Sequence, residues 1–300
     1  MAKQLRILTG QVAAITGGGR GIGRAMAEAF LREGMRVAIG DVDVVTAQRT
    51  ADELGRGTVA LELDVTKRES VEQFADEVER RLGPIDVFVN NAGIMPVGRF
   101  VDEDDATAHR QVDINVHGVI YGCKVALGRM LPRNRGHIVN VASQAGKFGI
   151  PGIATYVATK HAVVGLSEAL RGELHNMGAD GISVSVVMPN IVGTELGTGL
   201  SASRASKILT PEQVAEATVD ALQTGRFDVW VPKSAQSIAT VTGVLPRRGR
   251  EAIARAFKAD RVIWDADMGA RQGYELRAAH SEPGLEPGEE PEQLPEKTAS

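Results

Sequence analysis

Short apolar runs alternate with stretches of helical spacing along residues 1–234, and this alternation constrains the fold more than any other feature. The apolar runs are about as long as strands and are bounded by turn residues, which is typical of strands buried on both faces. The stretches between them place apolar residues three to four positions apart, as helices do when they pack through one face. Strands that alternate with helices predict a parallel sheet with helices on both sides.

Seven strands and six helices follow from this pattern. Strands are predicted at 11–16, 36–40, 58–63, 85–89, 137–142, 182–188 and 227–231. Helices are predicted at 21–33, 43–54, 68–82, 103–131, 154–177 and 211–223. The predicted fold class is therefore α/β, with a doubly wound, parallel, seven-stranded sheet and a C-terminal helical extension.

The chain divides into three parts by composition. Residues 1–234 contain no linker and are predicted to form one domain. Residues 235–280 are predicted to form a C-terminal helical arm. Residues 281–300 repeat Pro and Glu with few core-forming side chains, which predicts a disordered acidic tail.

Charge and cysteine content exclude several classes of protein. The formal net charge is −4, and residues 281–300 alone contribute −5, so the rest of the chain lacks the basic surface of a nucleic-acid binder. The single cysteine, Cys123, excludes an internal disulfide, and the six His have no metal-ligand spacing, so no metal site is predicted. Without an apolar leader or a spanning segment, the protein is predicted to be cytoplasmic.

A glycine cluster lies between the first predicted strand and the helix after it. It has the sequence TGGGRGIG over residues 16–23. Glycines let the backbone turn tightly and approach a pyrophosphate, whose charge is favoured at a helix N-terminus. The cluster therefore predicts a dinucleotide-binding turn, with a flexible turn that binds no ligand as the alternative.

Asp41 indicates which dinucleotide is bound. It follows the second predicted strand, eighteen residues after Gly23, where a carboxylate meets the ribose hydroxyls of adenosine. A carboxylate there repels a 2′-phosphate and favours NAD over NADP. Arg20 favours the opposite choice, because a nearby Arg can receive that phosphate. We give Asp41 more weight, because its carboxylate would occupy the phosphate position itself.

Tyr156 and Lys160 are four residues apart in a predicted helix and therefore project from one face. An ammonium beside a phenol favours the phenolate, because an opposite charge stabilises the ionised form. The phenol, with an ordinary pKa near ~10, is then a candidate for acid–base catalysis near neutral pH. Ser143 precedes Tyr156 by thirteen residues.

Four motifs together resemble those of one protein family. They are TGGGRGIG at 16–23, NNAG at 90–93, Ser143 with Tyr156-x3-Lys160, and the segment from Pro189 to Thr194. Over about residues 8–234 the chain resembles a short-chain dehydrogenase/reductase of the single-domain type. The resemblance implies a Rossmann fold and hydride transfer between a nicotinamide and an alcohol or carbonyl carbon.

The resemblance also implies roles for individual residues. Tyr156 would be the general acid/base, and Lys160 would lower the pKa of Tyr156 and hold the nicotinamide ribose. Ser143 would hydrogen-bond the substrate oxygen, and Asn115 would anchor a water that relays protons to Lys160. Cofactor contacts are predicted at Gly17, Gly19, Arg20, Gly21, Ile22, Gly23, Asp41, Asp64, Val65, Asn91, Ala92, Gly93, Tyr156, Lys160, Pro189, Val192 and Thr194.

One position departs from the family pattern. Pro189 is followed by Asn190, where the family usually has Gly. Asn tolerates a positive φ better than most residues, so the turn is expected to survive.

The predicted substrate contacts are mostly apolar. They are Ser143, Gln144, Phe148, Ile150 and Tyr156. The predicted substrate is therefore a lipophilic secondary alcohol or ketone of steroid, retinoid or long-chain type. Relatives of this fold imply a homodimer or homotetramer formed through the helices at 103–131 and 154–177.

Three alternatives stay open. One is an NADP-dependent carbonyl reductase, and another is a dinucleotide-sensing or scaffold protein without turnover. The third concerns residues 245–264, which have the composition of a basic amphipathic helix able to lie on a membrane surface. We favour instead a helix packed on the body or on a neighbouring subunit.

Overall fold

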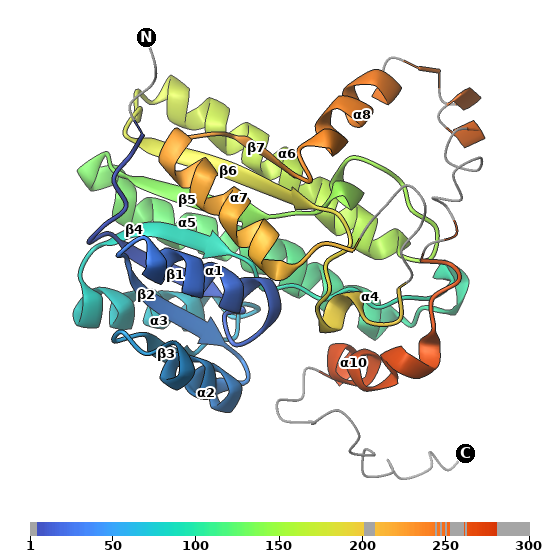
Figure 1. Cartoon of the computed structure of the whole chain (residues 1–300), viewed down its shortest axis with the longest axis horizontal. Helices are drawn as coiled ribbons and strands as arrows, with labels where there is room; N and C mark the ends of the chain where they lie inside the picture. The colour runs from blue at the N-terminus through green and yellow to red at the C-terminus, as the bar shows by residue number, and fades with distance from the viewer. Residues whose placement is uncertain are drawn as a thin grey trace.

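A sheet of seven parallel strands forms the centre of the molecule (Figure 1). The computed structural model describes residues 5–200, 208–243, 245–246, 248–249, 251–252, 261 and 263–280. The strands are β1 (Val12–Thr16), β2 (Arg36–Asp41), β3 (Val59–Glu62), β4 (Ile85–Asn90), β5 (Gly136–Val141), β6 (Ile182–Pro189) and β7 (Asp228–Val231). Their order is β3-β2-β1-β4-β5-β6-β7, which confirms the predicted doubly wound Rossmann sheet.

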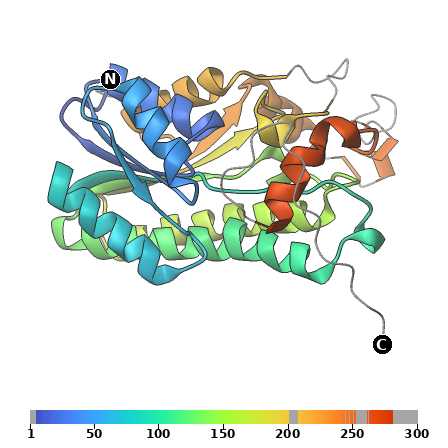
Figure 2. The ribbon, with the colours of Figure 1, turned by 90° about the horizontal axis from the view of Figure 1, so that it is seen from below.

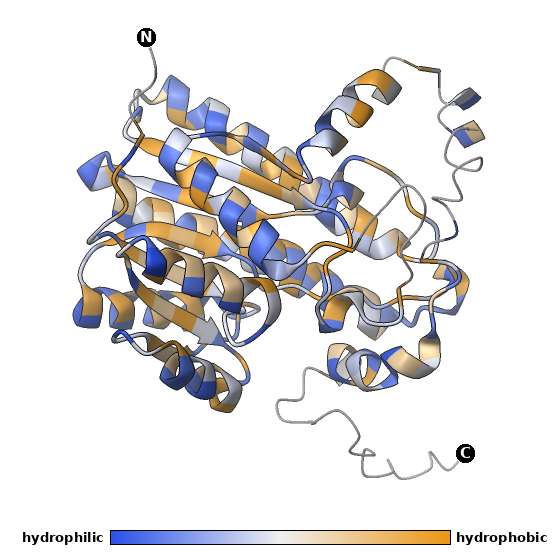
Figure 3. Ribbon diagram, in the orientation of Figure 1, coloured by the Kyte–Doolittle hydropathy of each residue, from blue (hydrophilic) through white to orange (hydrophobic). Residues whose placement is uncertain are grey.

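Helices cover both faces of this sheet (Figure 2). One face carries α1 (Gly21–Arg32), α2 (Val44–Leu54) and α7 (Pro211–Thr224). The other carries α3 (Arg68–Leu82), α5 (Gly118–Met130) and α6 (Ala154–Asn176). Within β1, Ala13 packs into the first layer and Val12 into the second. Both faces of the central strands are therefore buried, which explains their continuous apolar sequences (Figure 3).

The helical region predicted at 103–131 is not one regular helix. α4 (Asp105–Val112) leads into a π-helical turn, Asp113–His117, and α5 follows. The wider turn carries Asn115, whose side chain is fully buried. The sequence does not mark this irregularity, because residues 113–117 contain neither Pro nor Gly.

Two described helices follow β7. They are α8 (Ser234–Gly243) and α10 (Met268–His280), and α10 lies beside α4. Much of the predicted membrane-surface segment at 245–264 and all of the predicted tail at 281–300 lie outside the described residues. Among the residues that the structure describes, no helix has both the length and the apolar character needed to cross a bilayer.

Candidate active site

A cavity of about 490 Å³ opens at the carboxyl ends of the strands. Residues from the ends of β1 through β6 line it, including Gly17, Asp41, Asn91, Val141 and Pro189. The chain leaves the neighbouring strands β1 and β4 toward opposite sides of the sheet, and open α/β sheets bind ligands at such a point. The volume lies within the usual range for small-molecule pockets.

Two positions in the glycine turn after β1 do not accommodate a side chain, one because of its backbone conformation and one because of close packing. Gly17 adopts a positive φ of 62°, which favours glycine. A Cβ on Gly23 would lie 2.2 Å from the Gly17 carbonyl oxygen. The backbone itself therefore forms the wall at the N-terminus of α1, where a pyrophosphate could approach its N–H groups.

We expect Gly23→Ala to destabilise the fold by about 1–3 kcal/mol, because the added methyl overpacks against this backbone. Gly128→Ala is the matched control, since a Cβ on Gly128 in α5 would meet no atom within 4 Å. That substitution should raise helix stability by roughly 0.5–1 kcal/mol. Urea unfolding of both variants checks the difference, and equal stability would contradict the proposed crowding.

Hydrogen bonds tie the loop after β4 to the glycine turn. The Asn91 side-chain amide donates to the carbonyl oxygens of Thr16 and Gly17, both at 2.9 Å. The Thr16 hydroxyl oxygen accepts from the backbone N–H groups of Asn91 and Ala92 at 2.9 and 3.0 Å. These bonds fix the two loops that meet where β1 and β4 separate.

Asp41 lies at the end of β2 and lines the same cavity. Its carboxylate accepts from the backbone N–H of Gly19 at 3.0 Å and from that of Asp43 at 3.1 Å. Burial raises the pKa of Asp41, while these two hydrogen bonds and the Arg20 charge act in the opposite direction. The carboxylate is thus held in place as a hydrogen-bond acceptor at the edge of the cavity.

Arg20 is engaged by two acidic side chains. Its guanidinium pairs with Asp43 and, at 3.2 Å, with Glu195 in the loop after β6. It also donates to the Thr46 hydroxyl at 3.2 Å. These contacts hold the Arg20 cation beside Asp43 and Glu195.

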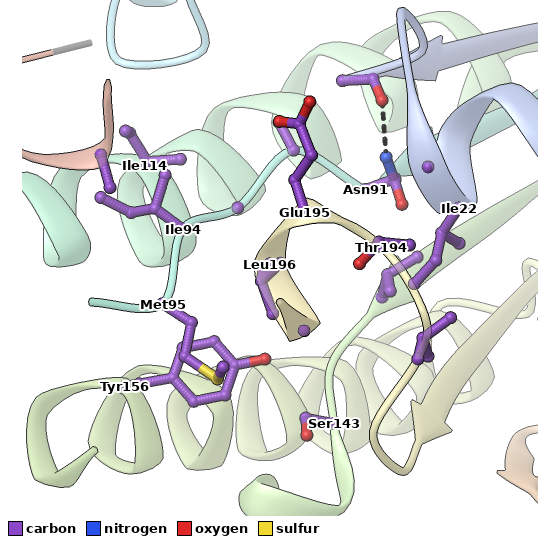
Figure 4. A pocket seen from close by; sticks show the side chains of 18 of the residues that line it. Ile22, Asn91, Ile94, Met95, Ile114, Ser143, Tyr156, Thr194, Glu195 and Leu196 are labelled. Atoms are coloured by element: carbon purple, nitrogen blue, oxygen red, sulfur yellow. Dashed lines mark hydrogen bonds between the residues drawn. The ribbon is translucent and has the colours of Figure 1, made fainter. Parts of the chain in front are cut away.

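Tyr156, Lys160 and Ser143 come together at one wall of the cavity, as their spacing predicts. Figure 4 shows Tyr156 and Ser143 at this wall. Tyr156 and Lys160 project from one face of α6, and the Lys160 ammonium lies 5.5 Å from the centre of the Tyr156 ring. The ammonium donates to the Val141 carbonyl oxygen at 3.0 Å. Ser143 follows β5, and its hydroxyl oxygen accepts from the Ala145 N–H at 3.1 Å. The arrangement places a phenol, a hydroxyl and an ammonium within one small region.

Burial, and not the neighbouring ammonium, dominates the pKa of Tyr156 in this geometry. Burial raises the pKa of Tyr156 to about 12, and a hydrogen bond with Ser143 acts in the opposite direction. Burial also lowers the pKa of Lys160 to about 8. In the protein without a bound cofactor, burial therefore acts against the phenolate, because desolvation penalises both charged forms. The lowering of the Tyr156 pKa by Lys160 stays a prediction.

Asn115 lies behind the cavity wall. Its amide oxygen accepts from the Ile94 N–H, and its amide nitrogen donates to the Ile94 carbonyl oxygen, both at 2.9 Å. The same nitrogen donates to the Thr159 hydroxyl at 3.2 Å. Asn115 thus fixes the loop after β4 onto α6, and its water-anchoring role stays a prediction.

The change from Pro-Gly to Pro-Asn leaves the backbone unstrained. Asn190 is absent from the described non-glycine residues with positive φ, which are Arg56 and Asn134. Its N–H donates to the Val231 carbonyl oxygen at 2.9 Å. The turn after β6 therefore does not depend on a left-handed residue at this position.

Most of the predicted site residues line the cavity, but four do not. Three of them contact lining residues from outside the cavity, as described above: Gly19, Gly23 and Asn115. Phe148 does not line it either, because its ring packs against Trp230 with the ring centres 6.5 Å apart. The structure thus places Phe148 outside the cavity lining, and its role as a substrate contact stays a prediction, whereas Gln144 and Ile150 do line the cavity.

The loop after β6, at residues 190–206, was expected to form part of the substrate wall, and Glu195, Leu196 and Leu200 line the cavity. The sequence predictions missed the lining residues of the C-terminal arm, which are Ile263, Tyr274, Arg277 and Ala278. Tyr274, one of only three tyrosines in the chain, is the one signal that could have pointed to the arm. Among the described part of the chain, no group of three or more His, Cys, Asp or Glu side chains is arranged to hold a metal ion.

Comparisons with known proteins give consistent results. The family model for short chain dehydrogenases matches residues 11–205. Sorbitol dehydrogenase of Cereibacter sphaeroides is 39% identical, covering 65% of this chain and 75% of its own. The 17-beta-hydroxysteroid dehydrogenase 13 of Mus musculus is 33% identical, covering 77% and 76%. A short-chain dehydrogenase/reductase from Burkholderia phymatum, solved in complex with NAD, superposes with a TM-score of 0.72 at 30% identity, covering 79% of this chain and 94% of its own.

Proposed function

The chain belongs to the short-chain dehydrogenase family of oxidoreductases, and from that premise we propose that it is an NAD-dependent enzyme interconverting a lipophilic secondary alcohol and its ketone. One observation carries the proposal. Asp41 and the group of Ser143, Tyr156 and Lys160 line a single cavity, with the glycine turn between them.

The residues at the end of the cavity near α1 fit a dinucleotide. The glycine turn offers backbone in place of side chains, and the Asp41 carboxylate is braced as an acceptor for ribose hydroxyls. Arg20, the candidate for a 2′-phosphate, is paired with Asp43 and Glu195. This supports NAD over the NADP-dependent alternative, and the name of the NAD-bound structural relative agrees with it.

At the other end, Tyr156 would transfer the proton and Ser143 would hydrogen-bond the substrate oxygen as its charge develops. When bound, the oxidised nicotinamide supplies the hydride acceptor, and its positive charge favours the phenolate form of Tyr156. Lys160 adds a second positive charge near the phenol. Because all three groups are present, the non-catalytic alternative has less support.

The substrate end is mostly apolar, which supports a lipophilic substrate. Its lining includes Ile94, Met95, Ile114, Ile150, Ile153, Leu196, Leu200 and Ile263. The names of relatives differ, since one is a sorbitol dehydrogenase and another a hydroxysteroid dehydrogenase. We favour the hydroxysteroid-like class, because the lining offers large apolar contacts. The cytoplasmic location and the homodimer or homotetramer stay predictions.

We expect the protein to bind NADH at least about tenfold more tightly than NADPH, because a carboxylate beside a 2′-phosphate is repulsive. Asp41→Asn should reduce this preference by improving NADPH binding, since it removes the charge and keeps an acceptor. Asp52→Asn, on the exposed side of α2, is the matched control. Fluorescence titration measures both affinities. Tighter NADPH binding by the unmodified protein would refute the NAD assignment.

Coupled assays with 2-octanol and lactate test the substrate class. A preference for lactate would refute the assignment of a lipophilic substrate.

A further inference from the structure

Arg271 in α10 is a fully buried cation, with 0% of its side chain exposed. Its Nε atom donates to the Glu275 carboxylate at 2.7 Å. Its Nη1 atom donates to the carbonyl oxygens of Leu196 and Thr198 at 2.9 and 2.8 Å, and Nη2 donates to that of Met95 at 2.9 Å. An arginine is rarely buried unless it is paired in this way, so the site is built around the guanidinium.

These bonds join three segments that are far apart in the sequence. Met95 lies in the loop after β4, while Leu196 and Thr198 lie in the loop after β6. Arg271 on α10 contacts both loops at once through a rigid, planar group. The geometry of one side chain therefore sets the separation of the two loops.

Neighbouring residues of α10 strengthen the same connection. The Tyr274 hydroxyl oxygen accepts from the Met95 N–H at 2.7 Å, so α10 holds both backbone polar groups of Met95. Glu275 accepts from the Val97 N–H at 3.3 Å. Just before α10, the Asp267 N–H donates to the Gly199 carbonyl oxygen at 2.9 Å. The start of α10 is thus fastened to both loops.

Both loops contribute to the substrate wall. Met95 packs in an apolar cluster with Tyr156, Ile153 and Ile263, and Leu196 packs against the same cluster. Figure 4 shows Met95 beside the ring of Tyr156 and Leu196 on the neighbouring loop. A shift of either loop would change the space in front of the Tyr156 hydroxyl.

We propose that Arg271 is a positioning residue that clasps the loops after β4 and β6 and thereby fixes the width of the substrate chamber. This inference rests on the proposed function for its kinetic consequence. Tyr156 and Lys160 are held by α6 and Ser143 by the end of β5, while Gly17 and Asp41 lie at the ends of β1 and β2. The predicted dinucleotide contacts in the two loops are anchored independently of Arg271, because Asn91 donates to the carbonyl oxygens of Thr16 and Gly17, and Gly193, between Val192 and Thr194, donates to that of Leu209. Loss of the clasp should therefore weaken substrate binding and spare both proton transfer and NADH binding.

The test compares Arg271→Ala and Arg271→Lys with Arg68→Ala in the full-length chain. Arg68 forms the same Arg–Glu pair at positions i and i+4, but in α3 and exposed to solvent. Hydrogen exchange of the apo proteins is measured by mass spectrometry over residues 94–98 and 195–200. We expect about tenfold faster exchange in both segments for Arg271→Ala, an intermediate effect for Arg271→Lys, and no change for Arg68→Ala.

Kinetics with 2-octanol and NADH titration provide the second readout. Arg271→Ala should raise the KM for 2-octanol about tenfold, with kcat and the NADH Kd nearly unchanged. Unchanged exchange in both segments, equal acceleration throughout the chain, or a fall in kcat at constant KM would each overturn the clasp. If no alcohol is oxidised by the unmodified protein, the proposed function fails while the exchange result still decides the clasp. Should Arg271→Ala not fold, Tyr274→Phe must accelerate exchange over residues 94–98, because it removes the acceptor of the Met95 N–H.

Discussion

Tyr156→Phe is expected to lower kcat for alcohol oxidation by about 10²–10⁴-fold, the usual contribution of a positioned general acid or base. The substitution removes only the hydroxyl, so the ring still packs with Met95 and Ile153. The NADH Kd should change little, because Asp41 and the glycine turn remain in place. The effect should therefore appear in turnover and not in cofactor binding.

The measurement is steady-state kinetics with 2-octanol beside a fluorescence titration with NADH. Tyr121→Phe in α5 is the matched control, because it removes the same atom from a tyrosine outside the cavity lining. A Tyr156→Phe protein that keeps full turnover would refute the assignment of the proton carrier. Loss of NADH binding in parallel would instead indicate a structural role for the hydroxyl.

The sheet could be predicted closely, because its strands carry a strong local signal. Every strand end lies within one residue of the prediction. Burial on both faces makes each central strand a continuous apolar run, and Gly or Pro residues mark several of its ends. The order of the strands does not follow from the strand–helix alternation, because doubly wound sheets with this alternation occur in more than one order.

The spacing of Tyr156 and Lys160 also places them correctly, since residues four apart share a helix face in any context. Their pKa values could not be predicted in the same way. Desolvation depends on side chains from distant segments, such as Met95 and Ile263, that bury the phenol. A local pattern identifies the partners but not the dielectric environment around them.

The contribution of α10 to the cavity wall could not be predicted from the sequence for a related reason. An arginine in a helix of low hydropathy predicts an exposed position, yet Arg271 is buried because three carbonyl oxygens and Glu275 receive its hydrogen bonds. The three carbonyl oxygens belong to loop backbone, and every residue carries such an oxygen, so the sequence does not mark them as partners of Arg271. Phe148 shows the opposite case, since its side chain turns toward Trp230 and away from the cavity.

The second large effect concerns the stability cost of Lys160. Its pKa is about 8 in the folded protein, against 10.5 for an ordinary lysine, because its ammonium is buried. At pH 7 the side chain is protonated in both the folded and the unfolded state, so this difference destabilises the fold by roughly 3 kcal/mol. Lys160→Met removes the charge but also one hydrogen bond to Val141, worth about 1 kcal/mol. We expect the variant to be more stable at pH 7 by about 2 kcal/mol.

The pH dependence distinguishes this cause from improved packing. Between the folded pKa of about 8 and the unfolded value of 10.5, the unfolded state binds more protons than the folded state. The stability of the unmodified protein therefore rises with pH across this window, while Lys160→Met lacks that contribution. The advantage of the variant should shrink by roughly 2 kcal/mol between pH 7 and pH 9.5.

Urea unfolding at both pH values measures this change, with Lys124→Met in α5 as the control for an exposed lysine. The control should stay within about 0.5 kcal/mol of the unmodified protein at both values. If the difference in unfolding free energy between Lys160→Met and the unmodified protein is the same at pH 7 and pH 9.5, a buried charge is excluded as its source.

Turnover of Lys160→Met should fall by about 10²-fold or more, because the cation no longer stabilises the phenolate. A residue whose replacement stabilises the fold and lowers turnover is retained for chemistry, since packing alone would favour the methionine.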